Sequence, residues 1–385
     1  MALLLNHYTK VVEPLSLIII SMKLIKSIII VTAAVLVCVS CAHKSNDTHL
    51  SESNDALSID TTLQSFTDLV LKDHSGCIVA IEPNTGEIKC MSSSKSDCNA
   101  LSFEFAPGRV YQPIQAMIAL EEGVIDSATR LPASFSMGGF RLDCLSNPGS
   151  ADFRTAMEQH NEAYFAWCFV FALNKTKYAD VQSAYASWIE YANSMGLGKP
   201  FGVDTKNETG GLIPSRSDYA RKFRTEKWKP INVIHDAIGK GDIRVTPIQM
   251  ANLAAIIANR GYYLTPHLSQ GARKESQKNQ SRISPEVYNL MAGLMKRETK
   301  DGAGYCCFGD TLGYSKENYT VSMGYYPVEN PRITFCCYLD NDGIEGFDAN
   351  ALLEMLVTHC NKRNGAHADD HLDKRLSEYT SHVEI

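Results

Sequence analysis

The stretch Ala237-Ile238-Gly239-Lys240-Gly241-Asp242-Ile243-Arg244-Val245-Thr246-Pro247-Ile248-Gln249-Met250-Ala251 contains a well-defined helix start. Within it, Thr246-Pro247-Ile248-Gln249 supplies a capping threonine, a proline suited to the first helical position and a glutamine that completes a capping box. Apolar residues at helical spacing continue to Asn259 and Gly261, which are typical of a helix end. The stretch therefore predicts an apolar helix that begins at residue 247 and ends near residue 259.

Predicted strands lie on both sides of this helix. Residues 76–92 have the pattern of a β-hairpin around the turn Pro83-Asn84-Thr85-Gly86, and residues 318–326 and 332–339 have the pattern of two further strands. Other helices are expected over residues 113–122, 155–172, 180–195, 284–294 and 348–360. Strands at both ends with helices between them predict an α+β domain, in which helices flank a mainly antiparallel sheet. We expect the hairpin to lie next to the two later strands.

Composition and charge restrict the class of protein. The chain has 385 residues, of which 44% are hydrophobic and 21% charged, so it is globular and not disordered. The formal net charge of −6 argues against a nucleic-acid partner, which would require a basic face. Length alone allows one large domain or two average ones.

Ten of the 12 cysteines lie after residue 41. No C-x-x-C pair occurs among these ten, so neither a zinc site nor another metal site is expected, and nothing indicates a cofactor. Cys90 and Cys98 could close a small disulfide loop. The vicinal pairs Cys306-Cys307 and Cys336-Cys337 are expected as buried core residues, because free cysteine packs as a small hydrophobe.

The N-terminal residues 1–41 have the pattern of a targeting segment. Lys23 and Lys26 form a basic region, residues 27–39 an apolar region, and Val39-Ser40-Cys41 a small-residue cleavage site. This arrangement resembles a bacterial lipoprotein signal, which implies that Cys41 is lipidated. The alternative is an uncleaved membrane anchor, although the apolar run is short for one. Met22 is the expected start, because the basic region is complete without residues 1–21.

The chain beyond this segment is expected in three parts. Residues 42–63 are polar and aperiodic at their start, which predicts a tether between lipid and domain. Residues 64–360 hold the predicted strands and helices and form the expected domain. Residues 361–385 are highly charged and are expected as a C-terminal tail.

Several segments, in their order along the chain, resemble the transpeptidase domain of class B penicillin-binding proteins, within the superfamily that includes the β-lactamases. The segments are Gly76–Ile88, Pro107–Ile125, Asn161-Glu162-Ala163-Tyr164-Phe165, Gly210–Ser215, Ala237–Ala251, Ala258-Asn259-Arg260-Gly261 with Pro266-His267, and Gly324–Pro331. The resemblance implies the penicillin-binding fold over residues 64–360. It also implies three motifs, S-x-x-K, S-x-N and K-T-G, which carry the family's chemistry.

The first motif is altered at both chemical positions. Pro107-Gly108-Arg109-Val110-Tyr111-Gln112-Pro113 is similar to the family's P-G-S-T-F-K-P, with Arg109 in place of the acylated serine and Gln112 in place of the lysine. A guanidinium stays protonated and is not an acyl acceptor. An amide has no basic lone pair at neutral pH and cannot act as a general base.

The other two motifs are altered as well. The second corresponds to Gln159-His160-Asn161, where Gln159 replaces the serine and Asn161 remains; the resemblance implies that His160 points away from the nucleophile position. The third corresponds best to Gly309-Asp310-Thr311-Leu312, where Asp310 replaces the lysine, Thr311 remains and Leu312 replaces the glycine. An aspartate there would repel the carboxylate of the family's substrate. The resemblance also implies that Arg109 and Asp310 face each other as an ion pair.

Two other stretches match a motif formally. Ser92-Ser93-Ser94-Lys95 matches S-x-x-K but follows the hairpin instead of starting a helix. Lys300-Asp301-Gly302 loosely resembles K-T-G, at the end of a predicted helix with no strand pattern after it. We interpret both as solvated loop residues.

The resemblance favours a catalytically inactive domain, lipid-anchored in the cell envelope to a membrane that faces the periplasm. Its expected partners are cell-wall synthesis proteins or peptidoglycan fragments. The first alternative is an active serine D,D-transpeptidase or carboxypeptidase that acts on acyl-D-Ala-D-Ala stem peptides. A β-lactamase or β-lactam sensor needs the same acylating serine and meets the same objection. A decaying gene product is disfavoured, because random drift would not spare glycines and helix caps.

Overall fold

The computed structural model describes residues 57–72, 74–94, 98–144, 149–270, 277–314, 317–340 and 349–363. The chain divides into two units, Met1–Asp55 and Ala56–Ile385, and all described residues belong to the second. The predicted targeting segment with Cys41, most of the predicted tether, Lys95 and residues 364–385 lie outside these ranges. No helix within them has the length and apolar character needed to cross a bilayer.

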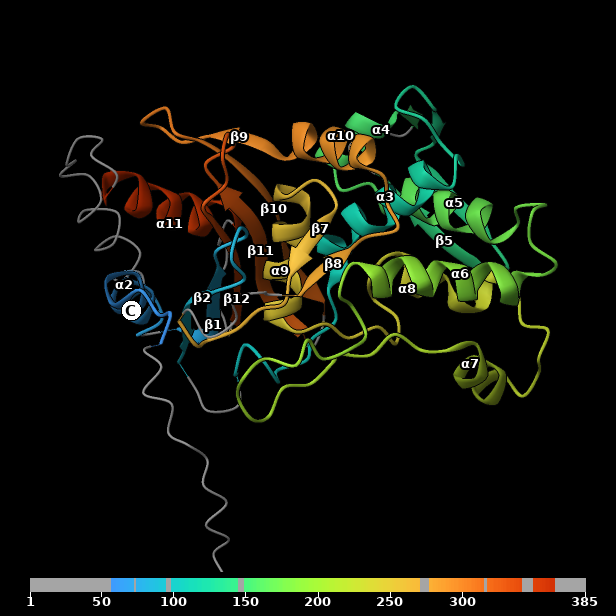
Figure 1. The fold of residues 1–385 in the computed structure, drawn as a ribbon. Helices are drawn as coiled ribbons and strands as arrows, with labels where there is room; N and C mark the ends of the chain where they lie inside the picture. The colour runs from blue at the N-terminus through green and yellow to red at the C-terminus, as the bar shows by residue number, and fades with distance from the viewer. Residues whose placement is uncertain are drawn as a thin grey trace, which may run out of the picture. The chain divides into compact units, whose positions relative to one another are not determined.

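A six-stranded antiparallel sheet organises the domain, with strand order β2-β1-β12-β11-β10-β9 (Figure 1). The strands are β1 Ser75–Ile81, β2 Ile88–Ser93, β9 Lys296–Glu298, β10 Gly304–Tyr314, β11 Glu317–Tyr326 and β12 Ile333–Asp340. The predicted hairpin is β1–β2, and β1 pairs directly with β12, with Cys77 opposite Tyr338. The α+β class and the position of the hairpin beside the two later strands are therefore confirmed.

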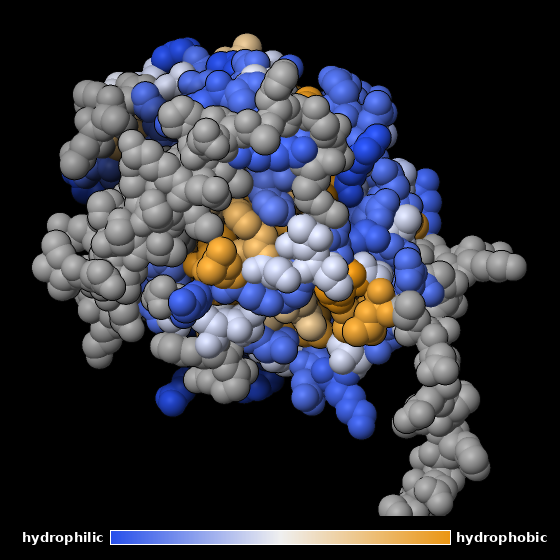
Figure 2. Space-filling view, turned by 90° about the vertical axis from the view of Figure 1, so that its left-hand side faces the viewer, coloured by the Kyte–Doolittle hydropathy of each residue, from blue (hydrophilic) through white to orange (hydrophobic). Residues whose placement is uncertain are grey.

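Each face of the sheet packs against its own hydrophobic core. Alternate residues of β1 point to opposite faces, so Ile78 and Ala80 contact one core and Cys77 and Val79 the other. Helices α2 (Thr61–Val70) and α11 (Ala349–Arg363) cover the first face, and the remaining helices lie on the second (Figure 1). The side on which α2 lies carries only small apolar patches among hydrophilic surface (Figure 2).

Helix α9 (Pro247–Ala258) is the central helix of the second face. All of its residues are buried, and it contacts β1, β11 and β12. Gln249 supplies one half of the predicted capping box, because its Oε1 accepts from the N–H of Thr246 over 3.0 Å, whereas Oγ1 of Thr246 has no partner among the described residues. A helix that is apolar on all sides is one that a fold encloses completely, so the opening stretch supplies the centre of the larger core.

The other elements of the second face surround α9. The helices are α3 Gln112–Glu121, α4 Phe153–Glu158, α5 Glu162–Leu173, α6 Val181–Ser194, α7 Arg216–Phe223, α8 Ile234–Ala237 and α10 Pro285–Met295, with 3-10 turns η1 Gly108–Tyr111 and η2 Pro230–Val233. The small two-stranded sheets are β3 Leu131–Pro132 with β6 Ser150–Ala151, β4 Ser134–Met137 with β5 Phe140–Asp143, and β7 Tyr262–Leu264 with β8 Lys278–Gln280.

The structure corrects the sequence interpretation in the middle of the chain. The helix expected over 155–172 is two helices, α4 and α5, separated at residues 159–161. His160 has a positive φ of 50°, which no α-helix can continue, and the side chain of Asn161 caps α5 by accepting from the N–H of Tyr164.

The folded unit also begins earlier than residue 64. The backbone of Ser58 donates to Leu268, and Asp60 caps α2. Residues 57–63, which were expected in the tether, therefore belong to the domain. At the other end, α11 extends to Arg363, three residues beyond the expected boundary at 360.

Candidate functional site

Two glycine segments, far apart in sequence, meet at the start of α3. The N–H of Gly108 donates to the carbonyl of Gly239 over 2.9 Å. A Cβ added to Gly239 would lie 2.1 Å from the carbonyl oxygen of Gly108, and both glycines have positive φ. Only glycine permits this approach. The contact places Arg109 and Lys240, the residues that follow the two glycines, on the same site.

Arg109 bridges two elements through its guanidinium. Its Nε donates to Oε1 of Glu162 over 3.0 Å, and its Nη1 lies 3.4 Å from Oδ1 of Asp310. Glu162 is the first residue of α5, and Asp310 lies in β10. The predicted ion pair between Arg109 and Asp310 is therefore confirmed, and the turn η1 is tied to both the helix and the sheet.

Glu162 and Lys240 are functional-site residues that the sequence interpretation missed. Nζ of Lys240 donates to the same Oε1 of Glu162 over 2.6 Å, so one carboxylate serves two cations. Arg109, Lys240, Glu162 and Asp310 form what we call the charge network, with two positive and two negative groups. Both residues lie in segments that resemble the family, and their charged side chains are the sequence feature that could have identified them.

Gln112 and Asn161 lie beneath the surface. Gln112 is fully buried, and neither atom of its side-chain amide has a hydrogen-bond partner among the described residues. Asn161 uses its Oδ1 as the cap of α5, whereas its Nδ2 has no partner there. A buried amide without hydrogen-bond partners lowers the stability of the fold. Gln112 therefore does not stabilise the fold through side-chain hydrogen bonds.

His160 lies inside the site and does not point away from it. Its ring packs at 4.8 Å from the ring of Phe308 in β10, two residues before Asp310. Burial is the main cause that lowers the pKa of His160; Asp310 acts in the opposite direction and Arg109 in the same direction. The lowered pKa favours the neutral imidazole form of His160. Gln159, by contrast, ends α4 and is exposed.

The predicted third motif lies in β10, a strand that the sequence interpretation did not identify. Asp310 is opposite Val321, Thr311 opposite Thr320 and Leu312 opposite Tyr319 in the β10–β11 pairing. Asp310 is buried, and its Oδ2 has no partner among the described residues. The side chains of Thr311 and Leu312 lie outside what the structure describes.

The two formal motif matches lie elsewhere. Ser92 is a buried strand residue of β2 that contacts Thr67 Oγ1 at 2.6 Å, so it is not the solvated loop residue expected. The stretch Lys300-Asp301-Gly302 is exposed, as expected, but it forms the turn between β9 and β10, so a strand does follow it. None of the described residues of these two stretches belongs to the charge network.

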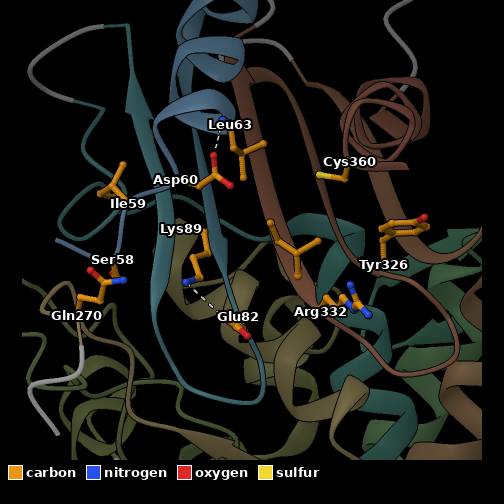
Figure 3. A pocket seen from close by; sticks show the side chains of 11 residues that line it. Ser58, Ile59, Asp60, Leu63, Glu82, Lys89, Gln270, Tyr326, Arg332 and Cys360 are labelled. Atoms are coloured by element: carbon orange, nitrogen blue, oxygen red, sulfur yellow. Dashed lines mark hydrogen bonds and ion pairs between the residues drawn. The ribbon is translucent and has the colours of Figure 1, made fainter. Parts of the chain in front are cut away.

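Of two hollows in the described part of the chain, one lies away from the site and the other borders it. One, of about 470 Å³, opens between α2, α11 and the edge of the sheet and is lined by Asp60, Lys89, Tyr326 and Arg332 among others (Figure 3). None of the predicted site residues lines it. The other, of about 320 Å³, contains Lys240 and the buried Asp236. Burial raises the pKa of Asp236 to about 6, against hydrogen bonds from Tyr219 and the N–H of Asp242.

The arrangement balances charge at the head of α3. The guanidinium of Arg109 is held by carboxylates and carries no nucleophilic lone pair. Gln112, one helical turn later, cannot accept a proton at neutral pH. The charge network is suited to recognising a charged group or to tying η1, α5 and β10 together by ion pairing.

Comparison with known proteins gives a consistent result. The family model described as the penicillin binding protein transpeptidase domain matches residues 76–356. The chain is 28% identical over 258 residues to the peptidoglycan D,D-transpeptidase MrdA of Acinetobacter baumannii, covering 58% of this chain and 37% of that protein. It is 22% identical over 307 residues to penicillin-binding protein H of Bacillus subtilis, covering 67% and 42%. The match therefore spans less than half the length of these two relatives.

Solved structures share the fold. PBP2 of Pseudomonas aeruginosa, in complex with WCK 5153, aligns with a TM-score of 0.67 at 20% identity, over 83% of this chain and 81% of that one. Penicillin-binding protein 2B of Streptococcus pneumoniae aligns with a TM-score of 0.65 at 18% identity, over 82% and 61%. Because the family model covers most of the chain, and these structures share its architecture, the chain belongs to the penicillin-binding protein transpeptidase family.

Proposed function

We propose that this chain is a non-catalytic member of its family that works in peptidoglycan synthesis by binding. Its ligand is a wall-synthesis protein or a peptidoglycan fragment, and no acyl-enzyme forms. The observation that carries the proposal is the charge network, in which Arg109 is held between Glu162 and Asp310. The resemblance of Pro107–Pro113 to the family's first motif is what assigns Arg109 to the nucleophile position. Neither Arg109 nor Gln112 can acquire the missing role through a pKa shift.

The alternative is an active D,D-transpeptidase or carboxypeptidase. It is favoured by the relatives that carry the name peptidoglycan D,D-transpeptidase. Activity would require a nucleophile other than residue 109. Ser92 is the formal candidate, but its hydroxyl is buried against Thr67 and Gln64.

Acylation by a β-lactam separates the two readings. The full chain should show no band with a fluorescent penicillin, and its intact mass should be unchanged after incubation with unlabelled drug. The MrdA protein of Acinetobacter baumannii, treated in parallel, serves as the positive control. A drug adduct on the wild-type chain, at Ser92 or any other residue, would refute the non-catalytic proposal.

Binding is tested with native membranes and with isolated peptidoglycan. The lipidated protein should retain a wall-synthesis protein in a pull-down from native membranes, or should co-sediment with peptidoglycan. An Arg109→Ala variant tests whether the charge network belongs to the binding surface. If neither the wild-type chain nor this variant retains protein or peptidoglycan, the binding role is wrong even if no acylation occurs.

We further propose that the protein is anchored in the cell envelope by lipid on Cys41. The support is the basic region, apolar region and small-residue site that precede Cys41. A Cys41→Ala variant should leave the membrane fraction or accumulate unprocessed. Cys38→Ala, three residues earlier, is the matched control and should fractionate as wild type. Identical membrane binding and migration of wild type and Cys41→Ala would contradict the anchor.

A further inference from the structure

The central strands of the sheet carry buried cysteines on both faces. Cys77 and Cys336 point into the larger core, together with Cys98 from the segment after β2. Cys90, Cys307 and Cys337 point into the smaller core, under α2 and α11. Because thiols on opposite faces of a strand cannot meet, this distribution limits which of them could be joined.

A disulfide between Cys90 and Cys98, which the sequence allowed, is excluded by this distribution. Cys90 faces the smaller core and Cys98 the larger one, so the sheet itself separates them. The vicinal pair Cys336-Cys337 is divided in the same way, one residue to each core. The described cysteines are all present as free thiols.

Cys77 and Cys98, in contrast, lie side by side. Cys77 is opposite Ser93 in the β1–β2 pairing, and the hydroxyl of Ser93 donates to the carbonyl of Cys98 over 2.9 Å. This bond holds the backbone of Cys98 over the strand position that Cys77 occupies. Both side chains are buried in the larger core, with exposures of 0% and 6%, and Cys98 is among the neighbours that raise the pKa of Cys77.

Cys336 is the nearest competitor for Cys77, and strand geometry disfavours it. Cys77 is opposite Tyr338 in the β1–β12 pairing, whereas Cys336 is opposite Val79. The two cysteines are therefore diagonal neighbours, for which the separation is about 7–8 Å. A disulfide requires Cα atoms roughly 4.4–6.8 Å apart. Cys98 comes from a loop and is not subject to this spacing.

We infer that Cys77 and Cys98 are a disulfide site, which closes when the chain folds in an oxidising compartment. The oxidant is a disulfide donor, such as oxidised glutathione or a disulfide-bonded oxidoreductase. Each of the two thiols loses its proton, one S–S bond forms between them, the S–S bond of the donor breaks, and the donor leaves as two thiols. The reaction uses none of the groups of the charge network, and its oxidising compartment rests on the proposed location in the cell envelope.

The bond forms during folding and not afterwards. Burial raises the pKa of the Cys77 thiol well above its ordinary value, so the folded chain holds almost no thiolate there. The same burial shelters a formed bond from reductants. It would join β1 to the segment that leads through Phe105 to the turn η1, and so would fix the approach to Arg109.

The test is a peptide map of the full chain. The protein is unfolded with reductant, refolded in a glutathione redox buffer, and alkylated in denaturant. We expect two fewer alkyl groups than on the fully reduced chain, and a fragment that links Cys77 to Cys98. Reduction should lower the melting temperature by roughly 5–10 °C. Full alkylation of every cysteine, or a link between any other pair, would overturn the inference.

Matched variants locate the bond. Cys77→Ser and Cys98→Ser should each leave the remaining partner open to alkylation, whereas Cys90→Ser and Cys336→Ser should leave the link intact. The wild-type map decides the question even if a variant fails to fold. The native, fully reduced protein placed in the same redox buffer should form the link at least roughly tenfold more slowly than the refolding chain. Equal rates would refute formation during folding.

Discussion

Arg109 makes its two ion pairs in different surroundings. Glu162 is 13% exposed at its side chain and Asp310 only 4%, whereas Arg109 itself is 32% exposed. Removing one partner from an ion pair that is shielded from water on one side lowers the free energy of unfolding more than removing one partner from a surface pair. The residue scale therefore offers direct tests of both the chemistry and the charge balance.

The first prediction concerns restoration of the first motif. Arg109→Ser together with Gln112→Lys returns a serine and a lysine to the head of α3, but Asp310 remains beside the site and repels the carboxylate of a penicillin. We expect this double variant to remain poorly labelled by a fluorescent penicillin. Labelling should become measurable when Gln159→Ser, Asp310→Lys and Leu312→Gly are added.

The control for this prediction is the double variant itself. If it is labelled without the additional changes, the non-catalytic proposal for the wild type stands, but the assignment of Asp310 to the third motif is wrong. Circular dichroism of each variant shows whether lack of labelling reflects lost structure.

The second prediction concerns the shared acceptor of the charge network. Glu162→Gln preserves the shape of the side chain but removes the charge that serves both Arg109 and Lys240. We expect it to lower the free energy of unfolding by about 1–3 kcal/mol, measured from urea midpoints. Glu158→Gln is the matched control: Glu158 is 53% exposed and 3.7 Å from Arg154, so its loss should cost under about 0.5 kcal/mol. Equal effects would show that the network contributes no more than a surface pair.

At the scale of elements, the contact between η1 and the glycine segment before α9 positions the site. Gly239 and Gly123 have similar positive φ values, 69° and 58°. Their surroundings differ, because a Cβ at Gly239 would meet the backbone of Gly108 at 2.1 Å, whereas a Cβ at Gly123 would meet no atom within 4 Å. Alanine substitutions at the two glycines therefore distinguish the cost of a left-handed backbone, which both share, from the cost of steric contact, which only Gly239 has.

The third prediction uses this pair of glycines. Gly123→Ala should cost roughly 1–2 kcal/mol, the cost of a left-handed conformation for alanine. Gly239→Ala should cost about 2 kcal/mol more, because the backbones of the two segments must separate. Urea unfolding of both variants gives the comparison. If the two substitutions cost the same, the close backbone approach does not contribute to stability.

At the scale of the whole molecule, the buried Asp236 couples stability to pH. Burial raises its pKa from the ordinary 3.8 to about 6 in the folded protein. Between about pH 4 and pH 6 the folded chain therefore holds a proton that the unfolded chain has released, so this group contributes stability that is lost as the pH rises through that window. Above pH 6 the cost of keeping the carboxylate buried is fully present.

The fourth prediction follows from this linkage. Asp236→Asn keeps one acceptor oxygen for the N–H of Asp242, and its amide NH2 can donate to the hydroxyl oxygen of Tyr219, but it does not titrate. Relative to wild type, it should gain up to about 3 kcal/mol between pH 4 and pH 7, measured as the difference in urea midpoints across that range. A flat difference for Asp236→Asn would refute the raised pKa.

The sequence by itself determined the parts of the fold that depend on local patterns. The capping box at Thr246 fixed the start of α9, and alternation with a turn fixed the β1–β2 hairpin. Segments that resemble the family, in their order along the chain, indicated the architecture. They also indicated that Arg109 and Asp310 face each other. Strand β10 was not predicted because its glycines and vicinal cysteines do not give the alternating apolar and polar pattern of a strand. It forms a strand through its pairing with β11.

Only the tertiary structure decided which side chains meet. Glu162 and Lys240 are far apart in sequence, and their contact depends on the approach of Gly108 to Gly239, which no local pattern encodes. His160 turns into the site because its left-handed backbone interrupts two helices. Cys98 lies over Cys77 and not Cys90, because the sheet divides the two cores. Local propensities act within a few residues, whereas these contacts follow from the packing of segments that the chain brings together only when it folds.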